Sequence, residues 1–74
     1  MSLRKFEFDI VLPADTTLAI YEGRVRYVIV TSREGLRLQI PATNLMPYVS
    51  DDGINGRFTM LLDENDKLVE LTRL

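Results

Sequence analysis

Three segments of the chain alternate apolar and polar residues with a period of two. Successive side chains of a β-strand point to opposite faces of a sheet, so this period predicts strands that are buried on one face only. A chain of 74 residues has room for one small domain, comprising residues 1–74, and these strands must share its core. The apolar members are Phe6, Phe8, Ile10 and Leu12, then Leu36, Leu38 and Ile40, and finally Phe58, Met60 and Leu62.

Residues 25–31 (VRYVIVT) predict a further strand, because β-branched and aromatic residues are enriched in sheets. This segment is apolar on both of its alternating faces, with Tyr27 and Ile29 on one and Val28 and Val30 on the other. We therefore expect an interior strand that is covered on both sides, by a helix or by a partner subunit.

Short connections join the predicted strands. The loop SREG links residues 25–31 to 36–40 as a hairpin, and DEND links residues 57–62 to a last strand at 67–74. Residues 14–23 (ADTTLAIYEG) predict one or two helical turns, with Asp15 or Thr16 as the cap. PATNLMPYV, with a proline near each end, predicts a single 3₁₀ or helical turn.

The expected fold is therefore mostly β (α+β). Five antiparallel strands would form a small barrel or a strongly curved sheet, with one short helix between the first and second strands. The register of the first hairpin stays open, because either face of residues 25–31 could pair with the apolar face of residues 36–40.

The composition excludes several kinds of chemistry. There is no cysteine and no histidine, so disulfides and the usual zinc, iron and copper ligands are absent. Histidine and cysteine are also the side chains most used for acid–base and nucleophilic catalysis near neutral pH, and the chain has neither. We expect no enzyme activity, no cofactor and no metal. Because Glu7 and Asp9 interrupt the N-terminal apolar stretch and no long apolar run occurs, we expect a cytoplasmic protein without a membrane segment.

Residues 50–58 (SDDGINGRF) form the most motif-like stretch of the chain. A phosphate-binding P-loop needs two glycines five positions apart followed by lysine, whereas Gly53 and Gly56 are three apart and Arg57 follows. We interpret the stretch as a turn in which both glycines take left-handed backbone conformations and Ile54 enters the core.

Four arginines and one aspartate are candidates for partner binding: Arg24, Arg26, Arg37, Arg57 and Asp52. Alternation places Arg24 and Arg26 on one face, and with the other two arginines they would form a cationic stripe for RNA or an acidic protein surface. Tyr27 and Tyr48 are the aromatic residues that could stack on bases. Alternatively, the arginines are solvated and pair with Glu22, Glu34 or Asp52. The net charge of −2 favours this second interpretation.

The order of these features resembles a family of short bacterial proteins, the domain of unknown function 2835. The resemblance extends over nearly the whole chain, through residues 24–42, 44–58, 62–67 and 71–74. Its most specific part is P-A-x-x-L-x-P-[YF]-V-x-x-D-G-I-x-G-R-F at residues 41–58. This family implies no activity, cofactor or catalytic residue that could be transferred to the chain.

Two functions follow as hypotheses. The first is a protein–protein interaction or adaptor module, which includes self-association through strand edges or the apolar outer face of residues 25–31. The second is binding of RNA or a nucleotide through the arginines. Salt separates the two, because arginine–phosphate contacts weaken steeply with ionic strength and apolar contacts do not.

Overall fold

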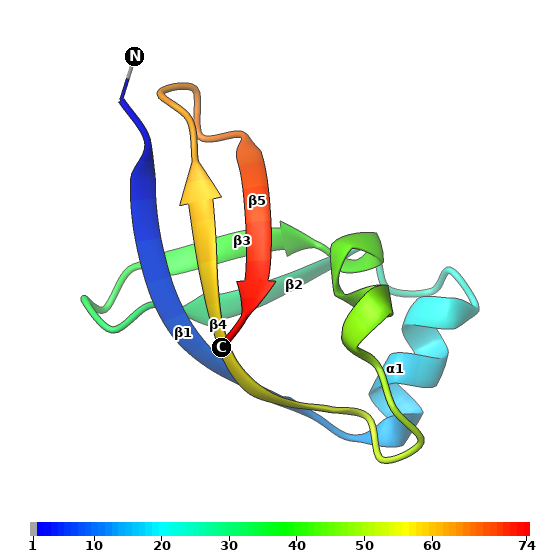
Figure 1. The fold of residues 1–74 in the computed structure, drawn as a ribbon. Helices are drawn as coiled ribbons and strands as arrows, with labels where there is room; N and C mark the ends of the chain where they lie inside the picture. Colours follow the sequence, from blue (N-terminus) through cyan, green and yellow to red (C-terminus); the bar gives the residue numbers. More distant parts are fainter. Residues whose placement is uncertain (1) are drawn as a thin grey trace.

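Five strands form two antiparallel sheets, and one α-helix and one 3₁₀ helix connect them (Figure 1). The computed structural model describes residues 2–74. The elements in chain order are β1 (Arg4–Leu12), α1 (Ala14–Tyr21), β2 (Tyr27–Thr31), β3 (Arg37–Pro41), the 3₁₀ helix η1 (Ala42–Tyr48), β4 (Ile54–Leu62) and β5 (Leu68–Arg73). The mostly-β prediction is confirmed.

The three-stranded sheet has the order β1-β4-β5. Its two long strands pair over nine residues, from Arg4 opposite Leu62 to Leu12 opposite Ile54. Because both strands alternate in the same phase, Phe8 lies opposite Phe58 and both side chains are almost fully buried. The period-two alternation of β1 and β4 therefore predicted their inward faces correctly.

The β2–β3 hairpin forms a separate two-stranded sheet. Its register pairs Val28 with Ile40 and Val30 with Leu38, and this decides which face of β2 turns toward the core. No helix covers the second face of β2 within residues 2–74, so that part of the expectation is wrong, and coverage by a partner subunit stays a prediction. Tyr27 and Ile29 point outward and are 56% and 50% exposed.

The barrel prediction is not confirmed, because the two sheets do not close. The hairpin crosses behind the three-stranded sheet (Figure 1) and meets β1 through a hydrogen bond from the Arg33 N–H to the Glu7 carbonyl, at 2.9 Å. On the other side, β3 ends at Pro41, which lacks an N–H, and the chain turns directly into η1. No ladder between β3 and β5 is present within residues 2–74.

The core lies between the two sheets and is capped by η1. Leu45 of η1 is fully buried, and the Tyr48 ring meets the Phe58 ring edge-on, with 5.1 Å between centroids. The Tyr48 hydroxyl donates to the Leu71 carbonyl at 2.9 Å. Tyr48 is therefore a half-buried packing residue and not one of the exposed aromatic residues that could stack on bases.

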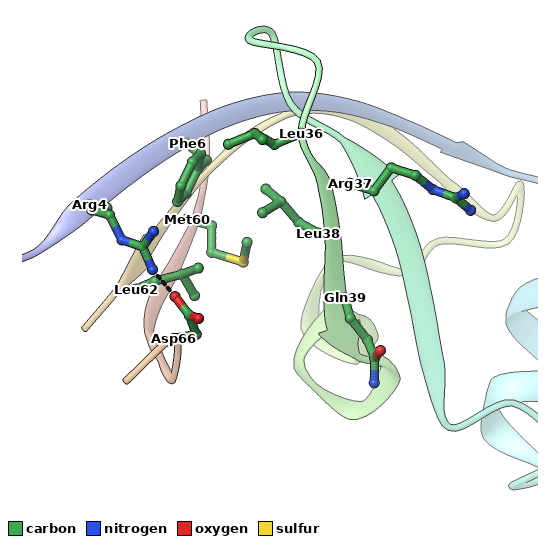
Figure 2. A pocket seen from close by; sticks show the side chains of 9 residues that line it. All are labelled: Arg4, Phe6, Leu36, Arg37, Leu38, Gln39, Met60, Leu62 and Asp66. Carbon is green, nitrogen blue, oxygen red and sulfur yellow. Dashed lines mark ion pairs between the residues drawn. The ribbon is translucent and has the colours of Figure 1, made fainter. Parts of the chain in front are cut away.

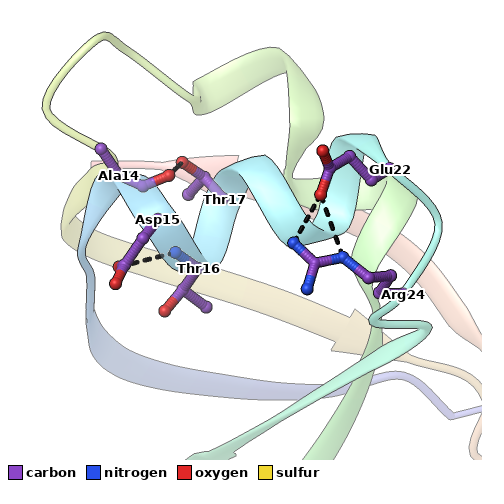
Figure 3. A network of polar contacts seen from close by, with 6 residues as sticks. All are labelled: Ala14, Asp15, Thr16, Thr17, Glu22 and Arg24. Atoms are coloured by element: carbon purple, nitrogen blue, oxygen red, sulfur yellow. Dashed lines mark hydrogen bonds and ion pairs between the residues drawn. The ribbon is translucent and has the colours of Figure 1, made fainter.

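Both predicted helical segments are present, but the capping prediction for α1 is wrong. Pro13 occupies the N-cap position and no side chain caps the helix. The Asp15 carboxylate instead accepts the N–H of Thr16 at 2.8 Å, and the Thr17 hydroxyl donates to the Ala14 carbonyl at 2.9 Å (Figure 3). Neither helix of the described chain has the length and apolar content that a membrane crossing needs.

Candidate functional site

Residues 50–57, which we call the 50–57 turn, comprise a tight main-chain turn at 50–53 and the first four residues of β4. Ser50 and Gly53 exchange main-chain hydrogen bonds of 2.7 and 3.0 Å. Gly53 has a φ of +100°, and a Cβ atom there would lie 2.1 Å from the Leu12 carbonyl oxygen and 2.8 Å from the Pro13 carbonyl carbon. Only glycine fits both this conformation and this approach to the β1–α1 junction. Ile54 is buried in the core, as predicted.

The second glycine of this stretch has a different role from the predicted one. Gly56 does not have a positive φ but lies within β4, opposite Ile10. A Cβ atom at Gly56 would lie 3.1 Å from the Arg73 Nε. The Arg73 guanidinium donates to the Asn55 carbonyl at 2.9 Å, so Gly56 makes room for a flexible side chain.

Charged side chains pair with one another on the outer face of the three-stranded sheet. The Arg57 Nε lies 3.3 Å from the Asp9 Oδ1 and 3.8 Å from the Glu7 Oε1. Arg33, from the β2–β3 turn, reaches the same Glu7 oxygen at 3.0 Å. Arg57 is therefore bound by β1 carboxylates, which the sequence did not identify as its partners.

The other predicted site residues are exposed, and they differ in their neighbours. Arg24 pairs with Glu22, as expected, with its Nε 3.0 Å from the Oε1 (Figure 3). Within residues 2–74, Arg26, Arg37 and Asp52 form no ion pair. Arg37 lies in the hairpin sheet and Arg57 in the other sheet, so the structure divides the four arginines between two surfaces. Their roles in binding stay predictions.

A cleft of about 320 Å³ opens between the two sheets, and no pattern in the sequence predicted it. Figure 2 shows Leu36 and Leu38 on one side facing Phe6 and Met60 on the other, while Arg37 points away from them. An ion pair between Arg4 and Asp66 lies at the rim. We call this the β3 cleft, and its lining residues are Arg4, Phe6, Leu36, Arg37, Leu38, Gln39, Met60, Leu62 and Asp66.

The β3 cleft has the chemistry of a binding surface. Phe6, Leu38, Met60 and Leu62 give it an apolar floor. Asp63 lies outside it, and the N–H groups of Lys67 and Asn65 lower the pKa of Asp63 by stabilising the carboxylate. That hydrogen bonding holds the β4–β5 turn together. Within residues 2–74, no cluster of three or more acidic side chains could hold a metal ion.

A model of the family described as "Protein of unknown function (DUF2835)" matches residues 4–74. The chain belongs to this family. No curated protein and no solved structure matches it. In this DUF2835 protein, residues 41–58 comprise the end of β3, η1, the 50–57 turn and the start of β4. The most specific stretch of the family resemblance therefore connects the two sheets and builds much of the core.

Proposed function

We propose that this DUF2835 protein is a non-catalytic protein–protein interaction module that binds its partner through the β2–β3 hairpin. The observation that supports this is the outer face of the hairpin, where Tyr27 and Ile29 are half exposed and no element of the described chain covers them. The three-stranded sheet carries the ion pairs of Arg57 on its outer face, and its exposed apolar residues Val11 and Val69 lie on two different strands, β1 and β5. Apolar side chains that gather on one surface favour association, because each Å² removed from water contributes about 25 cal/mol.

The absence of catalysis is part of the proposal. A general acid or nucleophile works best in a water-poor site where its pKa is tuned, and the chain has neither histidine nor cysteine for that purpose. Of the three charged residues that line the β3 cleft, Arg4 and Asp66 pair with each other at its exposed rim, and the Arg37 side chain points away from it. Such an arrangement suits recognition better than bond cleavage.

A tagged pull-down from the cytoplasmic fraction, split into nuclease-treated and untreated halves, tests this function. The variant Ile29→Asp places a charge on the outer face of the hairpin, and Val69→Asp does the same at a residue of equal exposure on β5 (50% and 54% exposed). We expect a protein partner that survives nuclease and high salt, is lost with Ile29→Asp and is retained with Val69→Asp. A partner held equally by both variants would contradict the assignment to the hairpin.

RNA or nucleotide binding is the second candidate, because Arg26 and Arg37 are exposed without ion-pair partners in the described chain and Tyr27 is exposed between them in sequence. Arginine contacts with phosphate release counterions and therefore weaken steeply with salt. Nucleic acid that is recovered only at low salt, and lost with Arg26→Gln, would favour this function over protein binding.

A further inference from the structure

The hydrogen bonds at the two ends of the hairpin determine which of its main-chain groups point outward. At the turn, the Ser32 N–H donates to the Leu36 carbonyl at 2.8 Å. At the open end, the Ala42 N–H donates to the Arg26 carbonyl, also at 2.8 Å. In an antiparallel ladder, hydrogen-bonded pairs alternate with pairs that are not bonded. The register is continuous between these two ends, so every second pair between them is bonded.

This alternation leaves the main-chain groups of two β3 residues unused. Leu38 and Ile40 belong to the bonded pairs, whereas Arg37 and Gln39 belong to the pairs that are not bonded. The N–H and C=O groups of Arg37 and Gln39 therefore point away from β2. We call these groups the β3 edge. Within residues 2–74, they form no hydrogen bond with any other element, and both residues are exposed.

The outer sides of the strands β2 and β5 each have one hydrogen-bonded contact in the fold. The side of β2 that does not pair with β3 lies toward β1. The Arg33 N–H, two residues beyond the end of β2, donates to the Glu7 carbonyl. On β5, the Leu71 carbonyl accepts the Tyr48 hydroxyl. The β3 edge thus combines free donors and acceptors with an adjacent apolar cleft, and free strand edges of this kind are templates for an added strand.

The β3 cleft provides the side-chain half of such a site. In an added strand, alternate side chains would point to the same face as Leu36 and Leu38, toward the apolar floor. The intervening side chains would point to the face of Arg37, whose guanidinium has no ion-pair partner within the described residues. An acidic residue there would gain a cross-strand ion pair.

We propose that the β3 edge binds an extended segment of a partner protein as an added strand. An apolar side chain of that segment fills the β3 cleft, and an acidic residue at an adjacent position pairs with Arg37. This inference rests on the proposed interaction function and names the site and the chemistry of the partner.

A second copy of the chain suits this edge less well. Pro41 has no N–H, so the edge offers two donors, from Arg37 and Gln39. Two-fold pairing of so short an edge would bring two unpaired Arg37 side chains onto one face of the new ladder, where like charges repel. A stable dimer also buries about 1,200–2,000 Å² in total, which a two-residue ladder alone does not supply.

The test uses a displayed library of random eight-residue peptides, selected against the full chain. We expect enrichment of peptides that alternate large apolar residues with aspartate or glutamate. In the complex of the best peptide, hydrogen exchange of the Arg37 and Gln39 amides should slow, because both become donors to the added strand. Selection of no peptide, or protection of amides elsewhere, would overturn the proposal.

Two variants sharpen the test. Gln39→Pro removes one outward donor and obstructs an added strand, while the ladder to β2 does not use that N–H. We expect affinity for the peptide to fall by roughly tenfold or more, because a buried hydrogen bond and its geometry are lost. Arg37→Glu should also reduce the affinity for acidic peptides, whereas Lys5→Glu, at an exposed position of β1 on the other sheet, should not.

The outcomes separate this inference from the proposed function. If Gln39→Pro lowers the melting temperature, the comparison of Arg37→Glu with Lys5→Glu tests strand addition without it. A natural protein partner that binds both β3 variants as tightly as the unaltered chain would preserve the interaction function and overturn strand addition. Dimers in sedimentation whose Arg37 and Gln39 amides are protected without peptide would also overturn it, in favour of a second copy.

Discussion

The 50–57 turn and the β3 edge differ in how the fold uses their polar groups. In the turn, Ser50 and Gly53 bond each other, and Gly53 lies against the β1–α1 junction at a distance that no side chain permits. Along β3, the main-chain groups of Arg37 and Gln39 face outward beside an apolar cleft and have no partner among residues 2–74. The sequence of the turn looks like a binding motif, whereas the sequence of β3 shows only the alternation of apolar and polar residues that is typical of a strand.

The comparison shows that the requirements of folding alone can explain the residues of a motif-like stretch. The glycines of residues 50–57 are explained by contacts inside the molecule, so they need no ligand. The interaction surface is better located by what folding leaves unused, namely free hydrogen-bonding groups, half-exposed apolar side chains and unpaired charges.

The largest expected effect is on stability, from Gly53→Ala. The new methyl group would require the backbone to move away from the Leu12 carbonyl, and the positive φ adds strain. We expect a loss of about 3 kcal/mol or more in the free energy of unfolding, measured by urea denaturation. The control is Gly56→Ala, where the Arg73 side chain can move aside and the loss should stay below about 1 kcal/mol. Equal losses would contradict the structural distinction between the two glycines.

A smaller effect is expected from Tyr48→Phe, which removes the hydroxyl that occupies the Leu71 carbonyl on β5. The ring contact with Phe58 is kept, so the loss should be about 1 kcal/mol, the typical contribution of one hydrogen bond. Urea denaturation measures it. Peptide binding at the β3 edge should be unchanged, and a large drop in that binding would mean that the two strand edges are coupled.

The smallest effect concerns acid stability at the β4–β5 turn, which borders the β3 cleft. The Lys67 N–H, and then the Asn65 N–H, lower the pKa of Asp63 in the folded chain. A carboxyl with a lowered folded-state pKa contributes stability that is fully present above its unfolded-state pKa and is lost as the pH falls through the folded-state pKa. Asp63→Asn should remove that acid-side dependence. An NMR titration that gives Asp63 an ordinary carboxyl pKa would refute this.

The sequence predicted the strands in which buried and exposed residues alternate. It did not predict features that depend on residues far away in the sequence. Phe6, Phe8 and Phe58 alternate with polar residues, and that pattern alone predicted their burial. Both faces of β2 are apolar, so the choice between Val30 and Ile29 as the inward residue needed the tertiary structure. Gly56 also followed from the fold, because its neighbour Arg73 comes from β5.

The candidate site was only partly visible in the sequence for the same reason. Arg37 was among the predicted partner-binding residues, but nothing local distinguished it from Arg57, which β1 carboxylates bind in the folded chain. The β3 cleft joins residues of β1, β3 and β4, which are far apart in sequence. The sequence analysis grouped Leu36 with the core-facing residues, and only the folded chain shows that it is 51% exposed.

Amide hydrogen exchange along β3 in the free protein tests the central claim most directly. The structure predicts slow exchange at Leu38 and Ile40, whose N–H groups bond β2, and fast exchange at Arg37 and Gln39, whose N–H groups face outward. This residue-by-residue alternation would establish an open edge. Exchange at Gln39 as slow as at Leu38 would show that the edge is already occupied within the fold or by a second copy, and would contradict the strand-addition site.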